Sequence, residues 1–129
     1  MSQADDLQYR AEAFADQSIK FVTGLPDTMI ARRMGGQLLD AATSVAANYR
    51  AARRGRSHDE FTAKIGLVSE EADETVFWLE RFANANIVST VPTARLLEEA
   101  VELAKIFYAS AGTARSRRRK RREGDPPRR

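Results

Sequence analysis

The residues that could carry acid–base chemistry gather in one acidic segment near the middle of the chain. Glu70, Glu71, Asp73 and Glu74 form the densest group of carboxylates in the sequence. Paired carboxylates can act as general acid and base when burial separates their pKa values. On a helical wheel, however, this group lies off the apolar face, with Glu71 at its edge. The segment therefore predicts a solvated or interface-facing acidic stripe, without a catalytic pair.

A metal centre is the other chemistry that a helical protein could support. Di-metal sites in helix bundles need inward carboxylates together with Glu-x-x-His pairs on two helices. The sequence has one histidine, His58, and no cysteine. Because His58 follows Gly55 closely and completes no such motif, we expect a solvated histidine in the first turn of a helix. We predict no catalytic residue, metal or cofactor, and an enzyme is the least favoured class.

Basic residues are concentrated in two groups. The first group surrounds an Arg-Gly-Arg-Ser break and consists of Arg50, Arg53, Arg54 and Arg56. Cations there complement a helix dipole, so a structural role and a ligand-binding role both stay open. The second group consists of Arg117, Arg118, Arg119, Lys120, Arg121 and Arg122, and it is denser than a helix end requires. Arginines that neutralise phosphates release counterions, which favours nucleic-acid binding; a solubilising tail or an acidic protein partner is the alternative.

The net charge of +3 hides an asymmetry between the body of the chain and its C-terminal stretch. From Arg115 onward there are nine basic and two acidic residues, whereas the preceding part has twelve basic and sixteen acidic residues. The final stretch has little to bury, and its like charges repel one another. The sequence thus predicts one folded domain over residues 1–114 and a disordered, Arg-rich tail over 115–129, with a frayed helical start at most.

Length and composition fit a single soluble domain. The chain has 129 residues, of which 43% are hydrophobic and 30% are charged. No stretch reaches the roughly 18 to 20 consecutive apolar residues of a membrane span, and the acidic N-terminus does not resemble a secretory signal. The absence of cysteine agrees with a cytoplasmic location. We therefore expect a cytoplasmic protein without a membrane partner.

Four segments show the apolar periodicity of amphipathic helices. They run from residue 3 to about 22, from 27 or 28 to about 54, from 57 to about 84, and from about 90 to 111. The first break between these segments contains Gly24 and Pro26, the second contains Gly55, and the third contains an Asn-Ala-Asn sequence. Ser57 and Glu60 have the spacing of a capping box, in which each side chain accepts from the other's backbone N–H. The predicted fold is all-α, an antiparallel up-and-down four-helix bundle.

The second predicted helix carries an apolar face and two adjacent glycines. Its face is expected to comprise Ile30, Met34, Leu38, Ala41, Ala42, Val45, Tyr49 and Ala52. Gly35 and Gly36 lie inside the helix, where each costs about 1 kcal/mol relative to Ala. No phosphate-binding glycine motif surrounds them, so we expect a kink or a close approach of a neighbouring helix.

Two aromatic residues of the third predicted helix fall outside its apolar stripe. Phe77 and Trp78 lie at about 160° and 260° from Phe61 on the wheel, and Leu67 lies near Trp78. The two aromatic rings therefore cannot both lie in the core of one subunit. A second buried surface is the common reason for such a patch, so Leu67, Phe77 and Trp78 are predicted to form a subunit interface; incidental partial burial is the alternative.

Several of these segments are shared with a bacterial protein family. They are Phe21–Pro26, Gln37–Asn48, Arg54–Ser57, Glu60 with Phe61, and Glu70–Glu80. Together they resemble the 23S rRNA-intervening-sequence proteins. The resemblance concerns the fold and not a reaction.

The resemblance implies a ring-like homopentamer of four-helix bundles. Members are encoded within intervening sequences of ribosomal RNA, and a relative is the accessory variability protein of diversity-generating retroelements, which binds nucleic acid and a reverse transcriptase through basic surfaces. Asn48 and Ser44 match the family's Ser-x-x-x-Asn stretch, and we expect Asn48 to form a helix–helix hydrogen bond. Where many members continue with Ile-Ala-Glu-Gly, this chain has Tyr49–Gly55, which adds arginines; the Arg-rich tail has no counterpart in the family core.

These observations favour a non-enzymatic, homo-oligomeric bundle that binds RNA or DNA as an accessory protein or ribonucleoprotein component. The alternative is a protein-interaction scaffold that docks a reverse transcriptase or an acidic partner and does not bind nucleic acid directly. Steep salt dependence of nucleic-acid binding would separate the two.

Overall fold

Three helix starts along the chain are fixed by hydroxyl side chains. Ser2, Thr28 and Ser57 each accept a hydrogen bond from the backbone N–H three residues later, at 3.0, 3.1 and 3.1 Å. The Ser2 cap is a complete capping box, because the Asp5 carboxylate accepts from the Ser2 N–H. The predicted box at Ser57 is only half formed, since the Glu60 carboxylate accepts from the Arg56 N–H instead, at 2.7 Å.

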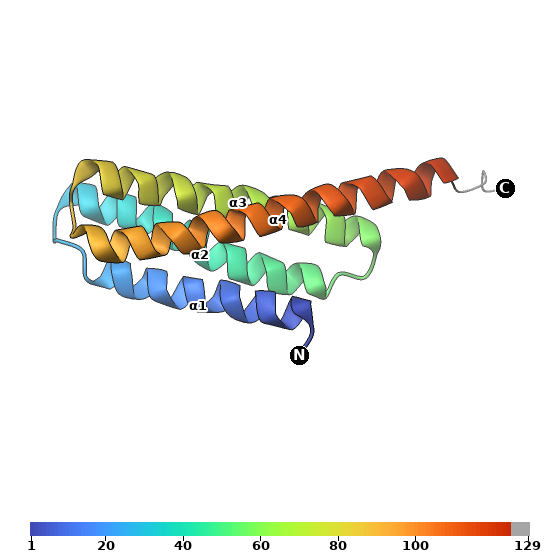
Figure 1. Cartoon of the computed structure of the whole chain (residues 1–129), viewed down its shortest axis with the longest axis horizontal. Helices are drawn as coiled ribbons and strands as arrows, with labels where there is room; N and C mark the ends of the chain where they lie inside the picture. The colour runs from blue at the N-terminus through green and yellow to red at the C-terminus, as the bar shows by residue number, and fades with distance from the viewer. Residues whose placement is uncertain (125–129) are drawn as a thin grey trace.

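Residues 1–124 are the part of the chain that the computed structural model describes, and they form four helices. These are α1 (Gln3–Thr23), α2 (Met29–Arg53), α3 (His58–Ala85) and α4 (Thr90–Gly124). Consecutive helices run antiparallel and are joined by short connections, with Asn86 in the left-handed conformation after α3 (Figure 1). Helix α3 packs closely on α2 and α4, while α1 contacts mainly α2. The predicted all-α four-helix bundle is confirmed.

The core is filled by apolar side chains from all four helices. Its largest fully buried members are Phe14, Leu38, Val45, Ile65, Val68, Leu79, Phe82, Leu103 and Phe107. Edge-to-face ring pairs join helices that are not consecutive: Tyr49 with Phe107, and Phe21 with Phe82, at 5.1 and 5.3 Å between ring centroids. The expected α2 face is correct apart from its first member. Ile30 is exposed and Ala31 is buried in its place.

Gly35 provides the close approach expected for the glycine pair. A Cβ at this position would lie 2.8 Å from Leu25 Cδ1 and 3.1 Å from Val22 Cγ1. At Gly36, by contrast, a Cβ would meet nothing within 4 Å. Only Gly35 is therefore required by the contact of α2 with the end of α1 and the α1–α2 connection.

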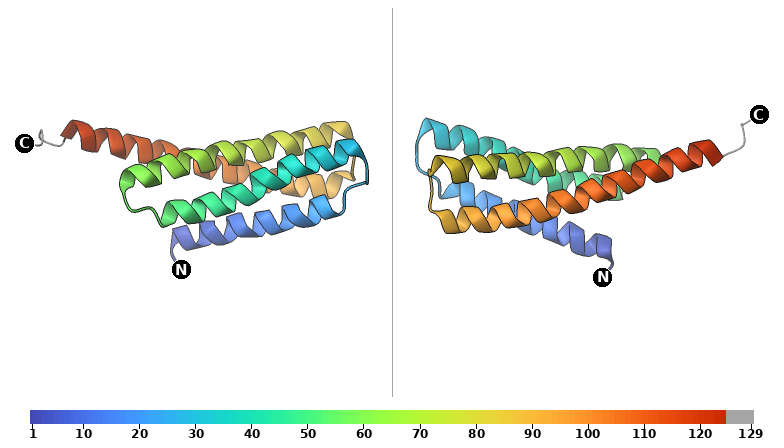
Figure 2. Two further views of the ribbon diagram at one scale, coloured as in Figure 1. Left: turned by 180° about the vertical axis from the view of Figure 1, so that it is seen from behind. Right: turned by 45° about the horizontal axis from the view of Figure 1, so that its top comes forward.

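Helix α4 corrects the prediction of a disordered tail beginning at Arg115. It continues through Gly124 and projects past the ends of the other helices (Figures 1 and 2). Arginine and lysine are good helix formers, and contacts with α3 offset part of the repulsion between their charges. Residues 125–129 of the predicted tail lie outside the described residues. Within residues 1–124, no helix is both long and apolar enough to cross a membrane.

Candidate nucleic-acid interface

The antiparallel topology brings the two predicted basic groups to the same end of the bundle. This end, called the basic end below, comprises the starts of α1 and α3, the last turns of α2, and α4 from Gly112 onward (Figures 1 and 2). Segments about sixty residues apart in sequence, Arg50–Arg56 and Arg117–Arg122, thus lie on one region of the molecule.

At the C-terminus of α2, one arginine is tied to α1, and a hollow lies beside it. The Arg53 guanidinium lies 2.7 Å from the Asp5 carboxylate. The hydrogen bond from Arg53, with further bonds from Ser2, lowers the pKa of Asp5, and the same contact raises the pKa of Arg53. The hollow, of about 300 Å³, is lined by Gln8, Glu12, Arg50, Arg53 and Arg54. Arg50, Arg54 and Arg56 are exposed.

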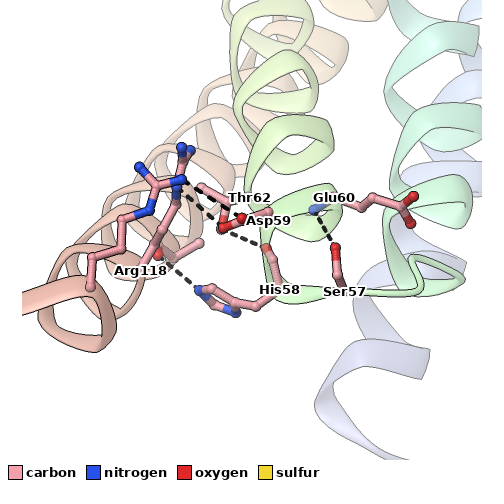
Figure 3. Close-up of polar contacts among 8 residues, drawn as sticks. Ser57, His58, Asp59, Glu60, Thr62 and Arg118 are labelled. Carbon is pink, nitrogen blue, oxygen red and sulfur yellow. Dashed lines mark hydrogen bonds and ion pairs between the residues drawn. The ribbon is translucent and has the colours of Figure 1, made fainter. Parts of the chain in front are cut away.

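A set of polar contacts, called the clasp below, joins the start of α3 to α4 (Figure 3). The His58 Nε2 atom lies 3.1 Å from the Ala114 carbonyl oxygen. The two Asp59 carboxylate oxygens face Arg118 Nε at 3.3 Å and a terminal nitrogen of Arg122 at 3.7 Å. His58 is therefore half-buried against α4, and the expectation of a solvated histidine was wrong.

Beyond Ala114, the last buried residue, α4 carries cations on an exposed helix. This segment, residues 115–124, is called the overhang. Its exposed basic side chains are Arg115, Arg117, Arg119, Lys120, Arg121 and Arg122. Among residues 1–124, the ion pairs made by the overhang are those of Arg118 and Arg122 with Asp59. Most of its positive charge therefore faces solvent.

The acidic segment of α3 is a surface feature with one structural contact. The Glu71 carboxylate accepts a hydrogen bond from the Asn48 side-chain amide at 2.7 Å, which confirms the predicted helix–helix bond of Asn48. Glu70, Asp73 and Glu74 are exposed. Within residues 1–124, no cluster of three or more His, Asp or Glu side chains is arranged to hold a metal ion.

A larger groove runs between α3 and α4. Its volume is about 600 Å³, and its lining residues are Gly66, Ser69, Glu70, Asp73, Val76, Val101, Ala104, Lys105, Tyr108 and Arg115. The carboxylates stand on the α3 side and the cations on the α4 side. The groove thus has an apolar floor between walls of opposite charge.

The predicted interface residues differ in their exposure. Phe77 is 46% exposed and Leu67 is 40% exposed, as expected for positions off the core. Trp78, by contrast, packs partly against the core, so the wheel placed it too far outward. Its ring meets Phe77 edge to face at 5.0 Å, and the Arg81 guanidinium lies 5.1 Å from the Phe77 ring centroid. The outer surface of α3 therefore offers Leu67 and Phe77 as its apolar groups.

The arrangement defines a class of protein: an antiparallel four-helix bundle with a basic end and with exposed apolar residues, Leu67 and Phe77, on α3. The chain belongs to the 23S rRNA-intervening sequence protein family, whose model matches residues 6–109. A crystal structure of a protein of unknown function from the S23 ribosomal protein family of Bacteroides thetaiotaomicron has a similar fold. The TM-score is 0.75 at 23% identity, over 81% of this chain and 97% of that chain. No curated protein shows a significant match.

The sequence did not predict the contacts between helices at the basic end. Asp5, His58 and Asp59 are ordinary helix-start residues when read locally. Some of their partners could have been found from the register of antiparallel helices, because residues at equal sequence distance from a connection lie opposite each other. Asp59 and Arg118 are nearly equidistant from the α3–α4 connection, whereas Arg53 lies about six residues farther from the α1–α2 connection than Asp5, so register alone does not give that pair.

Proposed function

We propose that this protein is a non-enzymatic, homo-oligomeric bundle that binds nucleic acid, RNA or DNA, through its basic end. The observation that carries the proposal is the convergence of the α2 arginines and the α4 overhang at one end of the molecule. Phosphate contacts supply most of the sequence-independent affinity of nucleic-acid binding, and arginine binds phosphate in a bidentate way.

Oligomerisation would strengthen such binding. A homopentamer, as the family resemblance implies, would carry five basic ends, and the first contact would raise the effective concentration of the others. Contacts that are weak in one subunit would then add up to useful affinity. Leu67 and Phe77 are the exposed apolar residues of α3 that we assign to the subunit contact.

The test compares the full chain with a chain that ends at Ala114, using fluorescence anisotropy with labelled RNA and DNA at increasing salt. Ala114 is the last buried residue, so the shortened chain keeps the whole core, which circular dichroism can verify. We expect the full chain to bind at low salt, with affinity falling steeply as salt rises, and the shortened chain to lose most of that affinity. Absence of binding by the full chain at low salt would refute the proposal.

A second candidate is a protein-interaction scaffold that docks a reverse transcriptase or an acidic partner. The groove between α3 and α4 favours it, because an apolar floor between charged walls suits a protein segment. This candidate predicts that nucleic acid binds equally weakly to the full and shortened chains. It also predicts that partner binding is lost when Tyr108, which is 71% exposed beside the groove, is replaced by Glu.

A further inference from the structure

The overhang is a continuous extension of a core helix, which gives it a defined direction. Helix α4 is buried through Ala114 and stays helical to Gly124. At 1.5 Å per residue, residues 115–124 extend about 15 Å beyond the core. The clasp ties Arg118, near the middle of this extension, and Arg122, near its end, to Asp59 of α3 (Figure 3). The overhang is thus a short rod fixed to the bundle.

Positive charge surrounds this rod on three sides. At 100° per residue, Arg115 and Arg119 lie on one flank, and Arg117 and Lys120 lie on another flank roughly 150° away. Arg118, Arg121 and Arg122 occupy the side between them, which faces α3 at Arg118 and Arg122. The remaining side has Ser116 and Glu123.

This distribution does not favour two simpler uses of a basic helix. A helix that inserts into a membrane surface needs an apolar face, and residues 115–124 contain no large apolar side chain. A helix that lies on a flat acidic surface needs cations on one side only. Cations on opposite flanks suit a ligand that presents negative charge on both sides of the helix at once.

We propose that the overhang inserts into the major groove of double-stranded DNA, with its two flanks on the phosphates of the two strands. The proposal rests on the proposed nucleic-acid function and names its ligand. The major groove of B-form DNA is about 12 Å wide and admits an α-helix, which measures about 10 to 12 Å with its side chains. The major groove of an RNA duplex is deep and narrow, and a single strand presents only one backbone. The side with Arg118 and Arg122 faces α3 and so points away from the groove, and the side with Ser116 and Glu123, which lies between the two flanks, faces the groove floor.

The experiment uses the full chain and three probes of the same sequence: a DNA duplex of two helical turns, the corresponding RNA duplex, and one DNA strand. Affinities are measured by fluorescence anisotropy over a range of salt concentrations. We expect the DNA duplex to bind tightest at every salt concentration. Equal or tighter binding of the RNA duplex or of the single strand would overturn the groove assignment.

Two matched variants test the two flanks separately. Arg115→Gln with Arg119→Gln removes one flank, and Arg117→Gln with Lys120→Gln removes the other. Glutamine keeps helix propensity, so circular dichroism should not change. For DNA duplex, each variant should reduce the steepness of log affinity against log salt by about 1.8, since each lost phosphate contact contributes about 0.9.

A third variant controls for net charge. Arg32→Gln with Arg33→Gln removes two exposed cations from the opposite end of the bundle and should leave the salt slope unchanged. If only one flank affects duplex binding, the helix lies on a surface and the groove assignment is wrong. If none of the three probes binds at low salt, the proposed function itself fails, which is a different result.

Discussion

At the scale of single residues, the neighbouring glycines of α2 lie in opposite environments. Gly35 is buried where α2 meets the chain leaving α1, and the space for a side chain there is taken by Leu25 and Val22. Gly36 points toward open space. Both glycines weaken the helix through their backbone entropy, but only Gly35 has a packing reason to be present.

Replacing each glycine by alanine should therefore change stability in opposite directions. Gly36→Ala should raise the free energy of unfolding by about 0.5 to 1 kcal/mol, because alanine favours the helix and meets no neighbour. Gly35→Ala makes the same backbone gain, but its Cβ would overlap Leu25 and press on the stiff Val22, and overpacking costs about 1 to 3 kcal/mol. We expect net destabilisation, measured as a lower urea midpoint. An increase in that midpoint for Gly35→Ala would show that Leu25 moves aside easily.

Residue types alone predicted some local features and failed at others. Ser57 was recognised as a helix cap because its hydroxyl acts within one turn. The role of Glu60 was wrong, since its carboxylate could reach either of two adjacent N–H groups and bonds that of Arg56. The helical wheel placed Trp78 outside the core because it gives only the direction of each side chain and not its size. A large ring at the border of the apolar stripe can still turn toward the core.

At the scale of elements, the clasp links the start of α3 to Ala114 and to the overhang. Asp59 neutralises part of the charge of Arg118 and Arg122, both of which could otherwise contact phosphate. Asp59 thus serves two opposing purposes: it directs the overhang, and it competes with a polyanion for two arginines. Exposed ion pairs of this kind contribute only about 0 to 1 kcal/mol to stability, so a phosphate can displace the carboxylate.

Replacing Asp59 by Asn should consequently strengthen nucleic-acid binding. Two arginines become available, so affinity for duplex DNA at moderate salt should rise and its salt dependence should steepen. The loss of a carboxylate from the first turn of α3 should cost only about 0.3 to 1 kcal/mol of stability. Affinity and salt slope can be measured by anisotropy, and stability by urea denaturation.

Asp6→Asn is the control for this prediction. Asp6 also lies in the first turn of a helix at the basic end, and it is exposed, so its replacement changes the net charge equally. If Asp6→Asn raised the affinity as much as Asp59→Asn, the effect would come from long-range charge and not from release of the clasped arginines.

The helices could be predicted where apolar residues recur at helical spacing, but not where the chain is dominated by charge. Apolar spacing and glycine, proline and asparagine breaks placed all four helices of the described residues. The run from Arg115 was expected to be disordered because it buries nothing. Its helix nevertheless continues, since α4 is already nucleated by its core turns and each further residue adds a hydrogen bond at small cost. The partner that offsets its charge, Asp59, is distant in sequence.

At the scale of the whole molecule, the basic end and the exposed apolar residues of α3 are separate. Asp59 and the clasp lie at the start of α3, whereas Leu67 lies about two turns further along the helix and Phe77 lies in its second half. Subunits that associate through the α3 surface would leave their basic ends uncovered. In a cyclic assembly with its axis along the bundles, all overhangs would point to the same side. One face of the ring would then carry the positive charge.

The proposed subunit contact can be tested by replacing Leu67 and Phe77 by Lys. Both side chains are partly exposed in the single chain, so their replacement should leave the fold intact while it removes apolar area from an interface. Trp78 is not changed, because it packs partly against the core and its loss would destabilise the subunit. Light scattering should show a monomer, and circular dichroism should show unchanged helix content. Tyr9→Lys replaces an aromatic residue of α1 that is 71% exposed and should keep the oligomer mass. If the mass stayed the same in the α3 variant but fell with Tyr9→Lys, the contact would lie on α1, and the basic ends would have to be arranged differently around the assembly.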